Sequence, residues 1–124
     1  MTQSIENTRM NKSEYRKMMK NRINSLLELE KGNLFQNVIF SEYIKQKGAK
    51  NLVEWLQYKG YKINTSYKGR KWNTTDIRNY VLDPQNHKGV NEDIVKIVCL
   101  MVNYTGKSSF EQRLFRAMKT VLKI

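Results

Sequence analysis

The chain has 124 residues, of which 40% are hydrophobic and 27% are charged, and its formal net charge is +12. This length suits one domain with its own core rather than two, and the ordinary apolar content argues against general disorder. No apolar run approaches the roughly 18 residues of a membrane span and no apolar signal region follows the start, so we expect a cytoplasmic protein without a membrane partner. The single cysteine, Cys99, cannot form an intramolecular disulfide and is expected to be a small buried hydrophobic residue.

Positive charge is concentrated in the middle of the chain. Residues 1–44 carry seven Lys or Arg against five Asp or Glu, residues 45–71 carry eight against one, and residues 72–124 carry eight against five. The three segments therefore contribute +2, +7 and +3 to the net charge. A concentrated cationic segment attracts polyanions, so we expect nucleic acid as the partner. An anionic membrane surface fits less well, because glycines interrupt the basic run.

The N-terminal part predicts a tail and two helices. Residues 1–12 are polar and aperiodic, so we expect a flexible tail followed by a single helical domain over residues 13–124. From Ser13 apolar residues recur at helical spacing as far as Gly32, which predicts a long helix with Ser13 as its N-cap and Gly32 as its stop. A second helix fits residues 33–46.

A third helix is expected to begin at Asn51, because Asn51-x-x-Glu54 resembles a capping box, and to end at Gly60. Residues 61–71, YKINTSYKGRK, predict a turn or a small β-hairpin that would act as a wing, or else a flexible basic loop. Either form would meet phosphates. The residues expected to bind phosphate are Lys59, Lys62, Lys68, Arg70, Lys71, Asn73 and Thr74.

A fourth helix begins after Trp72. The spacing Asn73-x-x-Asp76 predicts its N-cap, and Pro84 predicts its end near Asp83, because the residue before a proline disfavours helical geometry.

This fourth helix has one apolar face and one polar face. Ile77 and Val81 lie on the first, and Thr75, Arg78 and Asn79 lie on the second. Arg pairs with guanine, Asn pairs with adenine, and Thr contacts either a polar edge or a thymine methyl group. We therefore predict that Thr75, Arg78 and Asn79 read bases in the major groove. The same residues also fit the solvated side of any small helix, and this alternative stays open.

The C-terminal third predicts two more helices. Asn91 caps the apolar stretch 92–106, which is expected to be the central core helix, although its β-branched residues also fit a strand. His87 lies in a predicted loop without ligand partners, so no metal is expected. The spacing Ser108-x-x-Glu111 predicts the last helix, whose apolar stripe either completes the core or forms the surface of a homodimer.

No set of residues is typical of a catalytic site. The sequence contains no Gly-rich phosphate loop with its Lys, no suitable Ser/His/Asp set and no His/Cys cluster. The acidic residues Asp76, Asp83, Glu92 and Asp93 look like helix caps and helix-dipole partners. We therefore expect neither enzymatic activity nor a cofactor.

A series of spaced residues between positions 40 and 84 has a familiar order. The series comprises Lys47-Gly48, Leu52, Leu56, Gly60, Thr65, Gly69, Trp72, Ile77, Val81-Leu82 and Pro84. On these residues, about a third of the chain resembles the DNA-binding "recombinase" domain that follows the catalytic domain of large serine recombinases. The resemblance implies that the helix after Trp72 lies against DNA and that the preceding loop grips the backbone. It does not imply recombination, since the 124 residues contain neither a matching catalytic domain nor the cysteine pairs of a zinc ribbon.

These observations predict a mainly α-helical, compact domain of five to six helices with a helix-turn-helix or winged-helix-like unit. We expect a sequence-specific double-stranded DNA-binding protein, either a transcriptional regulator or an accessory factor of a phage, plasmid or other mobile element. One alternative is a phage- or plasmid-encoded inhibitor that covers an acidic surface of a host protein. Another is an RNA-binding protein in which Tyr58, Tyr61 and Tyr67 stack on bases.

Overall fold

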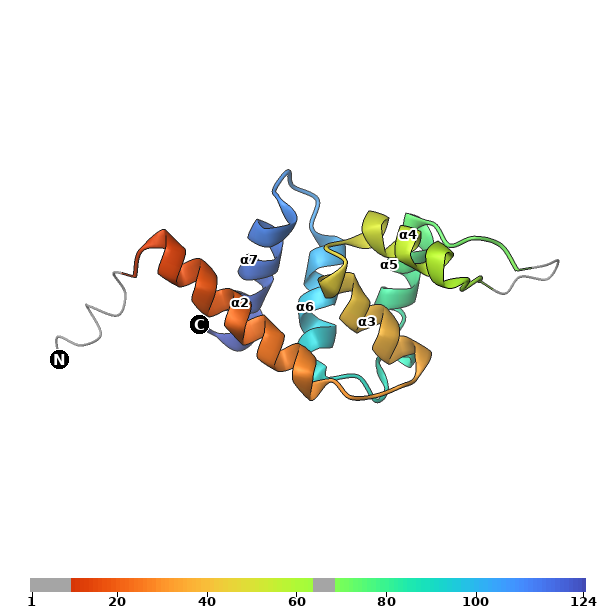
Figure 1. Cartoon of the computed structure of the whole chain (residues 1–124), viewed down its shortest axis with the longest axis horizontal. Helices are drawn as coiled ribbons and strands as arrows, with labels where there is room; N and C mark the ends of the chain where they lie inside the picture. The colour runs from red at the N-terminus through yellow and green to blue at the C-terminus, as the bar shows by residue number, and fades with distance from the viewer. Residues whose placement is uncertain (1–9, 64–68) are drawn as a thin grey trace.

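The computed structural model describes residues 10–63 and 69–124, and within them the protein is mainly α-helical (Figure 1). The elements are α2 (Lys12–Leu29), α3 (Phe35–Lys45), α4 (Ala49–Lys59), α5 (Thr74–Leu82), the short 3-10 helix η1 (Pro84–His87), α6 (Glu92–Asn103) and α7 (Phe110–Leu122). Helix α6 runs through the middle of the molecule, with α7 on one side and α3, α4 and α5 on the other (Figure 1). The predicted fold class, a compact and mainly helical domain, is confirmed, whereas the helix-turn-helix or winged-helix-like unit within it stays a prediction.

Helix α6 forms the centre of the core. It packs against α2, α3, α5 and α7, and the side chains of Ile94, Ile97 and Val98 are fully buried. Burial of each such side chain stabilises the fold by roughly 1.5–3 kcal/mol. The Asn91 side chain caps the helix by accepting a hydrogen bond from the Ile94 amide at 3.1 Å. The prediction of a central core helix is therefore confirmed, and the strand alternative for this segment was wrong.

Helix α2 begins two residues before the predicted start. Its N-cap is Asn11, whose side chain accepts from the Glu14 amide at 2.8 Å, while the Glu14 carboxylate accepts from the Asn11 amide at 3.2 Å. The prediction of Ser13 as N-cap was wrong, because the residue three positions after Ser13 is Arg16, which has no acceptor to return the bond. The predicted tail over residues 1–12 lies mostly outside the described residues.

Helix α7 begins one residue later than predicted. Ser109, not Ser108, is the N-cap, and it forms a capping box with Gln112. Glu111, which a cap at Ser108 would need, instead accepts a hydrogen bond from Arg16 of α2 at 2.7 Å. Ser108 bonds to the hydroxyl of Tyr104 at 3.0 Å. The Ser109–Gln112 capping box and the Arg16–Glu111 ion pair are therefore both compatible with a helix start at Phe110.

Helix α4 begins at Ala49, so the prediction of Asn51 as its N-cap was wrong. Lys47 and Gly48 both have positive φ, 65° and 117°, and this turns the chain sharply after α3. The helix starts at once, with the Leu52 amide donating to the Gly48 carbonyl at 3.0 Å. Gly60 ends α4 with a φ of 83°, as predicted.

Gly32 has a different role from the predicted helix stop. Helix α2 already ends at Leu29, and a Cβ atom on Gly32 would lie 2.2 Å from Nδ2 of the buried Asn37. The Asn37 amide donates to the Glu30 carboxylate at 2.6 Å and to the Gly89 carbonyl at 2.8 Å. Glu30 also accepts from the Asn91 amide. This polar network connects the α2–α3 link to the start of α6, and it requires a residue without a side chain at position 32.

His87 and Cys99 lie close together beside α5. The predicted loop at His87 is instead the end of η1, and Nε2 of His87 lies 2.7 Å from the Val81 carbonyl oxygen. The Cys99 thiol also donates to this oxygen, at 3.6 Å, and burial raises the pKa of Cys99. Cys99 is only partly buried, although it packs against the core, so the expectation of a small buried hydrophobic residue is confirmed only in part. Within residues 10–63 and 69–124, no group of three or more ligand side chains could hold a metal ion, and no helix is both long and apolar enough to cross a bilayer.

Candidate nucleic-acid interface

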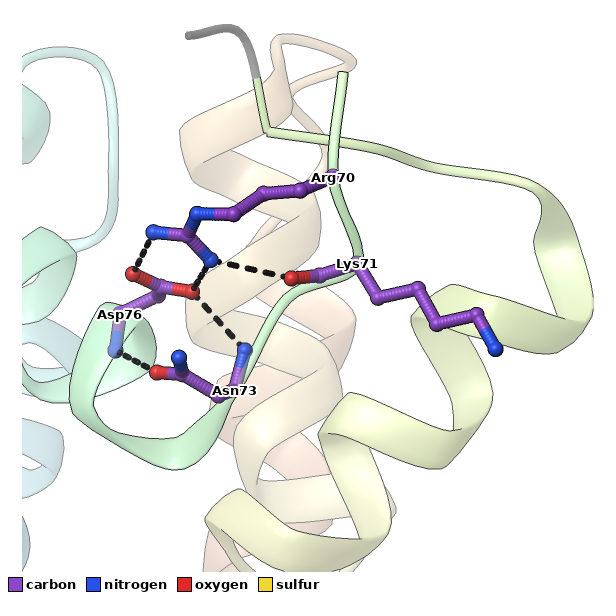
Figure 2. A network of polar contacts seen from close by, with 4 residues as sticks. All are labelled: Arg70, Lys71, Asn73 and Asp76. Carbon is purple, nitrogen blue, oxygen red and sulfur yellow. Dashed lines mark hydrogen bonds and ion pairs between the residues drawn. The ribbon is translucent and has the colours of Figure 1, made fainter. Parts of the chain in front are cut away.

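The start of α5 is fixed by local hydrogen bonds. The Asn73 side chain accepts from the Asp76 amide at 2.8 Å, and the Asp76 carboxylate accepts from the Asn73 amide at 2.9 Å (Figure 2). Two exposed backbone donors at the helix end are thereby satisfied. The prediction of Asn73 as N-cap is confirmed. Thr74, the first residue of the helix, is exposed.

Arg70 joins this helix end to the segment before it. Its guanidinium forms two parallel bonds to the Asp76 carboxylate, at 2.6 and 2.7 Å, and one bond to the Lys71 carbonyl at 3.0 Å (Figure 2). The hydrogen bond to Arg70 lowers the pKa of Asp76, and the bond to Asp76 in turn raises the pKa of Arg70. The Asp76 side chain is 10% exposed, whereas that of Arg70 is 46% exposed. Arg70 therefore holds residues 70–72 against α5. The guanidinium that was predicted to bind phosphate is already bonded to a carboxylate of the protein.

Aromatic side chains lie beneath this junction. Phe35, the first residue of α3, lies 5.3 Å from Tyr61, 5.6 Å from Trp72 and 5.6 Å from Tyr80, measured between ring centroids. Trp72 is 5% exposed and also contacts Tyr80 at 5.8 Å. Contacts between aromatic edges and faces add to the burial of these rings. The cluster attaches both ends of the 61–72 connection to the helical core.

The connection from α4 to α5 is paired at its base. Ile63 and Arg70 form an antiparallel bridge, with N···O distances of 2.9 and 3.1 Å. The predicted wing depends mainly on residues 64–68, which lie outside the described residues, as does the predicted phosphate contact Lys68.

The two faces of α5 differ as predicted. Ile77 and Val81 are fully buried, whereas Thr75, Arg78 and Asn79 are exposed. These three residues therefore share the solvent side of one short helix, next to Thr74 at its start.

Arg78 also bonds to a group within the protein, which its sequence position did not indicate. Its Nη1 donates to the Val102 carbonyl oxygen at 2.6 Å. Val102 is in the last turn of α6, where carbonyl groups lack helical partners and a cation is favoured by the helix dipole. Arg78 thus caps the C-terminal end of α6 with one of its five N–H donors, and this bond leaves the other donors for a base.

The predicted phosphate-binding lysines that the structure describes, Lys59, Lys62 and Lys71, are exposed. Figure 2 shows the Lys71 side chain extending away from the Arg70–Asp76 pair. Nζ of Lys59 lies 5.7 Å from the Trp55 ring centroid and 5.9 Å from that of Tyr58, at cation–π range. Lys62 is exposed beside the Ile63–Arg70 bridge. The ends of α4 and α5 and the described parts of their connection therefore present several cations on neighbouring segments.

No family model, curated protein or solved structure matches this chain.

Proposed function

We propose that this protein binds double-stranded DNA sequence-specifically, with α5 in the major groove and the connection before it along the phosphate backbone. One observation carries the proposal: Thr75, Arg78 and Asn79 are exposed together on a helix whose buried side is firmly packed. Short polar side chains, an amide and a guanidinium are the groups that discriminate base edges in the major groove.

The cations near α5 support a division of labour. Three exposed lysines lie near α5 in the chain: Lys59 ends α4, and Lys62 and Lys71 belong to the connection between α4 and α5. Phosphate contacts of this kind position a protein on the duplex, and base contacts then add specificity.

In this proposal Arg70 acts mainly as a positioning residue. Its two bonds to Asp76 set the angle between the cationic connection and the start of α5. A phosphate group could still contact the exposed edge of the guanidinium, because Arg carries more donors than the Asp76 carboxylate uses. The biological role that we propose is that of a transcriptional regulator or an accessory factor of a phage, plasmid or other mobile element.

Selection of bound sequences from a random duplex pool tests the proposal. We expect enrichment of a defined sequence, and a palindromic sequence would further indicate a homodimer with a fixed half-site spacing. Binding without enrichment, at affinities that depend only on salt, would contradict sequence-specific recognition.

A second candidate function, binding to unpaired bases of RNA, is favoured by exposed aromatic rings at the end of α4. Tyr58 is 85% exposed, and Trp55 stacks on Tyr61 at 6.1 Å with an interplanar angle of 23°. Aromatic rings among lysines are typical of surfaces on which bases stack. Competition between duplex DNA and RNA with single-stranded loops separates the two candidates, because Tyr58→Ala should weaken RNA binding selectively.

A further inference from the structure

A groove lies between α2, the end of α3 and the first turns of α7, with a volume of about 560 Å³. Its apolar floor is formed by Ile23, Leu27, Ile44, Phe110, Leu114 and Phe115. None of the residues that line it belongs to the candidate nucleic-acid interface, and in Figure 1 α2 and α7 are separated from α5 by α6.

The rim of the groove is cationic. Helix α2 contributes Arg16 and Lys20, and the end of α3 contributes Lys45 and Lys47. Glu111 is the one carboxylate among the described lining residues, and it is paired with Arg16 at 2.7 Å and with Lys20 at 3.7 Å. Lys45 is paired with Glu42, which does not line the groove, at 3.7 Å. The lining therefore keeps a positive excess around an apolar floor, which favours an anionic ligand with an apolar side.

Lys47 supplies a second, independent observation. Its φ of 65° lies in the left-handed region, at a position after a helix where Gly or Asn is usual. Lysine is a conformationally unfavourable choice at this position, yet it places a further ammonium group at the rim. Strain at a residue that lines a groove is more often found at functional sites than elsewhere.

We propose that this groove binds an acidic amphipathic helix of a partner protein. Such a helix can lay its apolar stripe on the floor and direct its carboxylates to cations on both walls, α2 and the end of α3. A single carboxylate on a small molecule would meet only one wall, so the distribution of cations favours a partner with several negative charges. The inference does not depend on the proposed DNA binding, because it uses other residues.

Fluorescence anisotropy with the full chain tests the proposal. The probe is a fluorescein-labelled 18-residue peptide of Leu, Ala and Glu in which Leu recurs at three- and four-residue spacing. We expect it to bind at least about tenfold more tightly than a scrambled peptide of the same composition, because only the first can form an apolar stripe. Equal binding of the two peptides would overturn the proposal.

Variants locate the binding site. Lys20→Gln and Lys47→Gly should each weaken binding of the peptide by about two- to fivefold, as expected for exposed ion pairs. The matched control is Lys17→Gln, which removes one charge from α2 outside the groove and should leave the affinity unchanged. Lys47→Gly should also raise the urea midpoint of unfolding, since Gly suits a positive φ, so a loss of affinity cannot be attributed to unfolding. An equal effect of all three variants would contradict the groove.

Two further outcomes would assign another occupant. If dodecanoate binds in the groove and the peptide does not, the groove holds a small amphiphile. If sedimentation detects self-association that Lys47→Gly abolishes, a second copy of the chain occupies it. Either result would overturn the proposal that the groove binds a helix of a partner protein. Neither result would affect the selection of bound DNA sequences, for which Lys20 and Lys47 are not required.

Discussion

Arg78 offers the sharpest test of the proposed interface, because one side chain has two roles. Its bond to the Val102 carbonyl caps α6, and the same guanidinium is predicted to read guanine. Replacing Arg78 with Ala removes an exposed hydrogen bond, so the free energy of unfolding should fall by about 1 kcal/mol. Loss of a bidentate base contact should remove about 1–3 kcal/mol of discrimination, which corresponds to roughly a 5- to 150-fold change in the ratio of affinities for the cognate and mutated sites.

Arg78→Lys separates the two roles. Lysine keeps a charge and one donor for the end of α6, so most of the stability should remain, but it lacks the planar fork that pairs with guanine in two bonds. Urea denaturation measures the stability, and competition binding to a selected site and its single-base variants measures discrimination. If Arg78→Lys retains full discrimination, or if Arg78→Ala weakens binding equally on every sequence, the side chain only caps α6 and the base-reading role is wrong.

Further predictions concern charge, pH and packing. Lys71→Ala should weaken binding to all duplexes alike and reduce the slope of log affinity against log salt by about 0.9, as measured by salt titration; a change confined to one sequence would contradict a phosphate contact. Because the bond to Arg70 lowers the pKa of Asp76 below its ordinary 3.8, the stability contributed by this carboxylate is present above pH 3.8 and is lost as the pH falls through the lowered pKa. The difference in urea stability between the wild type and Asp76→Asn should therefore shrink between about pH 5 and pH 2, and a constant difference would exclude this linkage. Gly32→Ala should cost about 1–3 kcal/mol of unfolding free energy, because the added Cβ must displace Asn37 from its buried hydrogen bonds; a loss below about 0.5 kcal/mol would show that the network adapts.

Predictions that depended on local patterns were mostly confirmed. The apolar periodicity located the helices, and the caps Asn73 and Asn91 and the stop at Gly60 were placed correctly, because each acts on backbone groups within a few residues. Helix starts were wrong where two capping residues competed. Ser108 and Ser109 each have a suitable acceptor three residues later, and in the structure Ser109 is the cap while Glu111 is bonded to Arg16, 95 residues away.

In the candidate interface, too, some features could be predicted from the sequence and others could not. The exposed polar face of α5 could be predicted, because a helix that buries Ile77 and Val81 must expose the residues opposite them. The bonds of Arg70 to Asp76 and of Arg78 to Val102 could not, since no period or motif connects these positions. Both arginines looked free in the sequence, and both have protein partners in the structure.

By itself, then, the sequence determined that this is a basic, mainly helical domain, and it determined which side of each helix is apolar, because helical periodicity and charge are properties of short segments. Tertiary structure alone decided which cations are already paired, which glycine must lack a side chain, and that α2, α3 and α7 enclose an apolar groove with a cationic rim. Those features arise where segments distant in the chain meet, and the meeting depends on how the whole core packs around α6.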